Sequence, residues 1–80
     1  MAAKIFSVIL ERNYRGFCRG DELTCIHTAK PMPGTVAILE RHDCGKWPIL
    51  FDEAGPEIAN GAKLVGQALS LHRNLLPAEV

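Results

Sequence analysis

Gly34–Asp52 reads GTVAILERHDCGKWPILFD and has the pattern of a β-hairpin. The apolar run TVAIL is followed by the turn-forming residues DCGK, in which Gly45 tolerates a positive φ, and then by a second apolar run, WPILF. The only tryptophan, Trp47, follows the turn directly, so we expect it to cover the apolar face of the hairpin. Pro48 lacks an N–H, which predicts that the second strand lies at a sheet edge. Because an isolated hairpin is marginally stable in water, other segments must cover it.

The segments on either side of this hairpin are expected to form the elements that cover it. Residues 1–11 favour a strand, although their apolar spacing also fits a short helix, and the alternation in residues 21–28 predicts another strand. Residues 52–61 predict a loop or an irregular entry to a helix. In residues 62–76 the apolar side chains share one half of a helical wheel and Pro77 follows, which predicts an amphipathic helix. The apolar half consists of Ala62, Leu64, Val65, Ala68, Leu69, Leu71, Leu75 and Leu76.

These elements predict an α+β fold for a single small domain, residues 1–80. We expect a small antiparallel sheet of three or four strands with one C-terminal helix packed on one face. The helix is expected to bury its leucines against the sheet. Alternatively, its last leucines, Leu71, Leu75 and Leu76, form a partner groove or the seam of a homodimer.

Size and charge exclude several classes of function. A chain of 80 residues has a thin core, which favours support from a partner, a metal or a second copy. The formal net charge is zero, which argues against binding nucleic acid through overall charge. Three cysteines without a CxxC pair, no signal-peptide pattern and no bilayer-length apolar run favour a cytoplasmic protein with reduced thiols.

Two charged segments are the candidate partner-binding surfaces. In the first, arginines alternate with aromatic residues: Arg12, Tyr14, Arg15, Phe17 and Arg19. This mixture suits phosphate contacts with base stacking, and it suits an acidic protein surface equally well. The second segment is acidic and contributes Asp52, Glu53 and Glu57. The competing interpretation is that both are solvated loops whose charges pair locally.

Two pairs of metal-ligand residues suggest an alternative, a small zinc-stabilised module. Cys25 and His27 are two residues apart, as are His42 and Cys44, so each pair faces one way on a strand. If the two segments pair as antiparallel strands with Cys25 opposite Cys44, the four side chains form a zinc-type ligand set. The spacing lacks the tight CxxC pairs of most zinc sites, so our expectation is no metal and no cofactor.

The sequence gives little support for catalysis. No local motif joins any of the three cysteines to any of the three histidines, and the glycines do not form a phosphate-binding loop. The adjacent acids Asp52 and Glu53 lie among loop signals, as solvated carboxylates do. We therefore expect a protein that is not an enzyme.

Short motifs within residues 20–73 resemble the carboxyl-terminal domain of self-cleaving LexA-like repressors. The Gly-Asp at 20–21 and the Gly-Thr-Val at 34–36 resemble the glycines that precede two strands in that family, and residues 64–73 resemble its closing strand. Glu-Arg at 11–12 stands where the family carries its nucleophilic Ser-Met, and the expected later lysine is missing. The resemblance therefore implies a protease-dead domain that acts in dimerisation.

In size and composition the chain also resembles small phage-encoded accessory proteins, including anti-CRISPR proteins. Together these observations predict a non-enzymatic small binding protein that docks on a protein or nucleoprotein partner, as an accessory or inhibitor protein of a phage or mobile element does. Nucleic acid contact through residues 12–19 and a homodimer are further expectations, and no membrane contact is expected. The repressor-like dimerisation domain and the zinc module are the alternatives.

Overall fold

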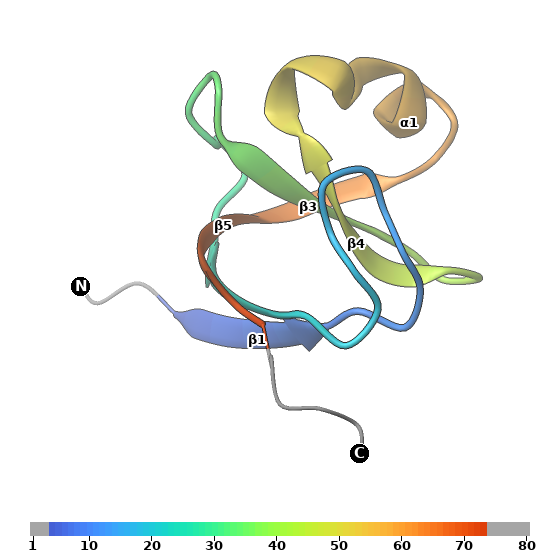
Figure 1. Ribbon diagram of the computed structural model, residues 1–80. Helices are drawn as coiled ribbons and strands as arrows, with labels where there is room; N and C mark the ends of the chain where they lie inside the picture. Colours follow the sequence, from blue (N-terminus) through green and yellow to red (C-terminus); the bar gives the residue numbers. More distant parts are fainter. Residues whose placement is uncertain (1–3, 74–80) are drawn as a thin grey trace, which may run out of the picture.

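A computed structural model describes residues 4–73 and shows a five-stranded antiparallel sheet. Its strands are β1 (Ile5–Ile9), β2 (Glu22–His27), β3 (Val36–Arg41), β4 (Gly45–Leu50) and β5 (Lys63–His72). A single 3-10 turn, η1 (Phe51–Glu53), and a short helix, α1 (Gly55–Ala59), connect β4 to β5. The order across the sheet is β1-β2-β5-β3-β4, so the last of the described strands lies in the middle of the sheet (Figure 1).

The predicted hairpin is confirmed as β3 and β4, which pair from Val36 opposite Leu50 to Arg41 opposite Gly45. The turn is a three-residue loop in which the Cys44 N–H donates to the Arg41 carbonyl at 3.0 Å. Gly45 follows with φ of 74°, the left-handed residue that such a loop requires. Strand β4 is an edge strand, as Pro48 predicts.

The predicted C-terminal helix is wrong, and with it the α+β fold class and the sheet of three or four strands. Residues 63–72 form β5, the longest strand, which pairs with β2 on one side and β3 on the other. Its register shifts once against β3, leaving Val65 without a partner, and once against β2, leaving Leu69 without one. These shifts bend the strand, which is visible in Figure 1. Leu75, Leu76 and Pro77 lie outside the described residues.

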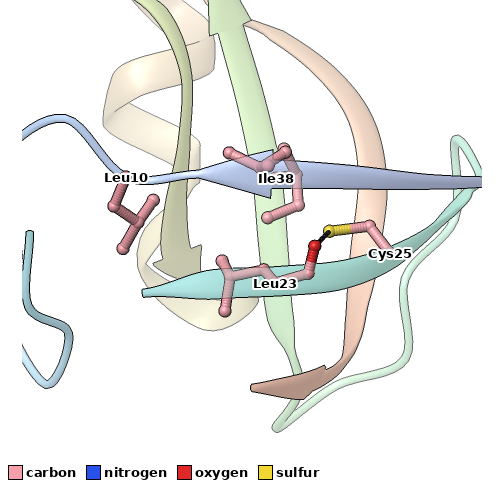
Figure 2. Packing of buried hydrophobic residues seen from close by; sticks show 5 residues of the cluster. Leu10, Leu23, Cys25 and Ile38 are labelled. Atoms are coloured by element: carbon pink, nitrogen blue, oxygen red, sulfur yellow. Dashed lines mark hydrogen bonds between the residues drawn. The ribbon is translucent and has the colours of Figure 1, made fainter. Parts of the chain in front are cut away.

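The sheet carries an apolar cluster on each face. The larger cluster contains Val8, Leu10, Leu23, Cys25 and Ile38, four of which are labelled in Figure 2. The smaller cluster contains Leu39, Ala54 and Ala62, with Trp47, Ile49 and Leu64 packed against it. Ala54 joins η1 to α1, so these two short elements cover the smaller cluster. Both faces of β3 are therefore buried, which accounts for its continuous apolar sequence.

Candidate functional site

The loop between β1 and β2 is a small hydrogen-bonded hairpin. Tyr14 and Phe17 exchange backbone hydrogen bonds, with N···O distances of 3.0 and 2.9 Å. Between them Gly16 has φ of 81°, which closes the turn and places Arg15 at its tip. The rings of Tyr14 and Phe17 pack against the larger cluster. We call residues Tyr14–Phe17 the aromatic turn. Its backbone pairing holds the aromatic side chains in place while Arg15 stays exposed.

A buried carboxylate anchors the base of this loop. Asp21 is 1% exposed, and it accepts a hydrogen bond from the Cys18 N–H at 2.8 Å. The guanidinium of Arg73, just after β5, donates two more at 2.9 and 2.8 Å. These bonds from Arg73 and Cys18 lower the pKa of Asp21 to about 2. Asp21 therefore ties the aromatic turn to the end of the central strand.

A groove of about 540 Å³ runs between the aromatic turn and the edge strand β4. Tyr14 and Phe17 form one wall, and residues 47–50 of β4 form the other. Trp47 and Ile49 belong to the face of the smaller cluster, whereas Pro48 lies opposite Ile38 on the face of the larger cluster. Because side chains from both faces line it, the groove follows the open edge of the sheet. We call it the edge groove.

The edge groove continues toward the turn of the β3–β4 hairpin. A neighbouring cavity of about 200 Å³ shares Tyr14, Trp47 and Glu57 with it and adds Arg12 and Arg41. The guanidinium of Arg41 is held locally, since its Nε donates to Asp43 at 2.8 Å. Within residues 4–73, no ion pair is found for Arg12. Arg12 is therefore the cation at this end that is available to a ligand.

Part of the acidic segment shares the edge groove with the aromatic turn. Glu53 and Glu57, from η1 and α1, both line the edge groove. A guanidinium nitrogen of Arg15 lies 3.6 Å from a carboxylate oxygen of Glu53, and the two side chains are 88% and 49% exposed. An ion pair this long and this exposed contributes little to folding. Its partners are thus free to exchange this contact for one with a ligand.

The structure brings together six of the eight predicted partner-binding residues. Those along the groove and its extension are Arg12, Tyr14, Arg15, Phe17, Glu53 and Glu57. The other two, Arg19 and Asp52, line neither cavity, and the Arg19 N–H is bonded to the Asn13 side chain at 2.8 Å. Sequence reasoning did not place Trp47, Pro48 and Leu50 in the site. The edge position of β4, indicated by Pro48, was the signal that could have done so.

The strand register required for the zinc site is absent. Strand β5 lies between β2 and β3, so Cys25 cannot pair across from Cys44. The Cys25 thiol is buried, donates to the Leu23 carbonyl at 3.6 Å (Figure 2), and has its pKa raised by burial to about 11. His42 and Cys44 are exposed in the hairpin turn. In the described part of the chain, no three histidine, cysteine or acidic side chains are grouped as metal ligands.

Comparison with known proteins does not identify this chain. No protein family, curated protein or solved structure matches it. The described residues contain no helix that is long and apolar enough to cross a membrane.

Proposed function

We propose that this chain is a non-enzymatic binding protein that docks on a protein, free or within a nucleoprotein, through the edge groove. One observation carries the proposal: the basic aromatic turn and the acids Glu53 and Glu57, 36 or more residues apart in the sequence, line one groove. Arg15 is exposed at the tip of the turn, so the packing of the larger cluster does not depend on its side chain.

The residue types along the edge groove support a protein partner. Tyrosine, tryptophan and arginine are the residues most enriched in binding hot spots, and here Tyr14, Arg15 and Trp47 line one groove. The scaffold beneath them is held by hydrogen bonds, so little order has to be created on binding. Glu53 and Glu57 stand among the arginines and would repel a phosphate backbone. A partner with mixed charge fits this surface better than nucleic acid alone.

The test is affinity capture from cells of the native host with two matched triple variants. In the first, Arg12, Arg15 and Arg19 are changed to alanine. In the control, three exposed lysines elsewhere, Lys4, Lys30 and Lys63, are changed to alanine. We expect a protein that is captured by the wild type and by the control and is lost with the arginine variant. Equal capture by all three proteins would refute the proposal.

Size, composition and free thiols support two further parts of the proposal. We propose that the protein acts in the cytoplasm, because its three cysteines are free. We also propose an accessory or inhibitor role in a phage or mobile element, which rests on chain length and composition.

A second candidate function is a repressor-like dimerisation domain. The observation in its favour is β5, because the resemblance to LexA-like repressors implies a strand at residues 64–73 and the structure has one at Lys63–His72. The exposed isoleucines of β1, Ile5 and Ile9, would then suit a dimer contact. Sedimentation equilibrium tests it: a dimer that Ile9→Lys dissociates supports this function, and a monomer at all concentrations refutes it.

A further inference from the structure

The hydrogen-bonding phase of the β3–β4 hairpin shows which backbone groups of β4 point away from the sheet. At one end the Phe51 N–H donates to the Thr35 carbonyl at 2.9 Å, and at the other end Arg41 lies opposite Gly45 beside the turn bond. Hydrogen-bonded pairs alternate along an antiparallel ladder. Residues 47 and 49 therefore bond to β3, and the backbone groups of Lys46, Pro48 and Leu50 face outward.

Pro48 and Leu50 line the edge groove, Pro48 as a buried and Leu50 as an exposed residue, and the exposed Lys46 lies on a smaller cavity that adjoins the end of β1. The register leaves these groups without a partner on β3, and no turn, loop or side-chain hydrogen bond within residues 4–73 uses the N–H of Lys46 or Leu50 or the carbonyl of Pro48. The outward backbone groups of these three residues form a row with two N–H donors, at Lys46 and Leu50, and three carbonyl acceptors. Pro48 supplies an acceptor without a donor.

We propose that an extended segment of the partner protein pairs with β4 as a sixth strand, lying in the edge groove. The proposal rests on the proposed function and specifies its mode of binding. Main-chain hydrogen bonds to the row would supply affinity, and the groove walls would read alternate side chains.

Pro48 favours a foreign strand over a second copy of β4. A residue of another strand opposite Pro48 can still donate its N–H to the Pro48 carbonyl. Only one of the two hydrogen bonds of that pair is therefore lost. In a symmetric antiparallel pair of β4 strands, each copy contributes its own proline, so two bonds are lost. Pro48 thus disfavours self-association of this edge more strongly than it disfavours pairing with another sequence.

The two walls specify the chemistry of the added strand. Side chains that point to the larger-cluster face would meet Tyr14 and Phe17, which are apolar and aromatic. Side chains that point to the other face would meet Trp47 and the carboxylates of Glu53 and Glu57. Successive residues of a strand alternate between faces. The segment should therefore alternate aliphatic residues with lysine or arginine, whose cations suit both carboxylate and indole.

Leu50 provides a substitution that removes one outward donor. Its φ is −57° and its ψ is 132°, which are values that proline adopts. The N–H that proline eliminates is not bonded within the sheet, so Leu50→Pro should leave the fold intact. Leu50→Ala is the matched control, because it shortens the same side chain and keeps the N–H.

The experiment titrates each ¹⁵N-labelled protein with the octapeptide of alternating valine and lysine, with a block octapeptide of equal composition as control. We expect the alternating peptide to slow exchange of the Lys46 and Leu50 amide protons with solvent. We expect Leu50→Pro to weaken binding about tenfold, as the loss of one good hydrogen bond does, and Leu50→Ala to weaken it less.

Three results would overturn strand addition. These are no binding of the alternating peptide at millimolar concentration, binding without protection of those two amides, and equal binding by Leu50→Pro and Leu50→Ala. None of them affects the arginine-dependent capture of the native partner. Conversely, edge pairing can succeed while that capture shows no dependence on arginine, so the two proposals fail separately.

Discussion

Arg73 and Asp21, 52 residues apart in the sequence, form a bidentate ion pair that joins the end of the central strand to the base of the aromatic turn. The Asp21 side chain is almost wholly buried, whereas that of Arg73 is 40% exposed. A buried carboxylate that lost this partner would be left with one backbone donor, from Cys18. The pair therefore holds one wall of the edge groove in position.

The first prediction is a pH dependence of stability that Asp21 causes. Its pKa falls from an ordinary value of 3.8 to about 2 on folding, because Arg73 and the Cys18 N–H stabilise the carboxylate. A lowered pKa means that this contribution to stability is complete above about pH 4 and is lost as the pH falls toward 2. Denaturant unfolding of the wild type and Asp21→Asn across this range measures it. The wild type should be the more stable at neutral pH, and the difference should shrink below pH 4; a constant difference would contradict this cause.

The second prediction compares two leucines. The sequence pattern placed Leu39 in a strand and Leu69 in a helix. Leu39 is fully buried in the smaller cluster, and Leu69, predicted from the helical arc to be core, is 52% exposed. Leu39→Ala should lower the free energy of unfolding by about 2–5 kcal/mol. Leu69→Ala should lower it by less than about 1 kcal/mol. Chemical denaturation measures both, and equal losses would mean that the assignment of β5 is wrong.

The error over residues 62–76 has a physical cause in β5 itself. A regular strand alternates with period two, but each register shift adds a residue to one face. Residues on one face of β5 are consequently spaced by three. Val65 and Ala68 pack against the larger cluster, and Leu71 pairs with the cluster residue Leu23. A spacing of three is what a helix face shows. In both register shifts the extra residue belongs to β5, so β2 and the β3–β4 hairpin keep their own alternation and their patterns predicted strands correctly.

The third prediction concerns Gly66, where the sheet permits close approach. A Cβ atom at Gly66 would lie 2.7 Å from the Ile26 carbonyl oxygen and 2.8 Å from the Phe6 ring. Because the carbonyl belongs to a neighbouring strand, it cannot move aside as a flexible side chain can. Gly66→Ala should destabilise the fold by about 1–3 kcal/mol. Gly55→Ala is the control, since nothing lies within 4 Å of its Cβ position. Thermal unfolding that ranks Gly55→Ala below Gly66→Ala would contradict this packing.

The candidate site was only half visible in the sequence, for a reason of topology. The alternation of arginine and aromatic residues marked the aromatic turn, and the run of acids marked η1 and α1. Their convergence depends on β5 entering the middle of the sheet, which leaves β4 at the edge beside the turn. Because residues 62–76 were predicted to form a helix, that arrangement was not predicted. Trp47 was correctly expected to cover the hairpin, and it packs against Leu39 and its neighbours while also lining the groove.

The fourth prediction separates binding from stability at Arg15. Its only ion pair in the described residues is the long, exposed contact with Glu53, so Arg15→Ala should leave the Tm nearly unchanged. As an exposed cation that lines the edge groove, it should contribute about 1–3 kcal/mol to partner binding. Isothermal titration with the captured partner, alongside Lys63→Ala, measures this contribution. Unchanged affinity for Arg15→Ala would remove Arg15 from the contact surface.

The most direct test of the edge groove is site-specific photo-crosslinking in native-host cells. Benzoylphenylalanine is placed at Leu50, beside the groove, and in a second protein at Ser70, an exposed residue of β5 that β3 separates from β4. We predict a crosslinked partner protein from position 50 and none from position 70, with the product lost when Arg12, Arg15 and Arg19 are alanine. Crosslinking from position 70 without crosslinking from position 50 would show that the partner binds another face and would contradict the account.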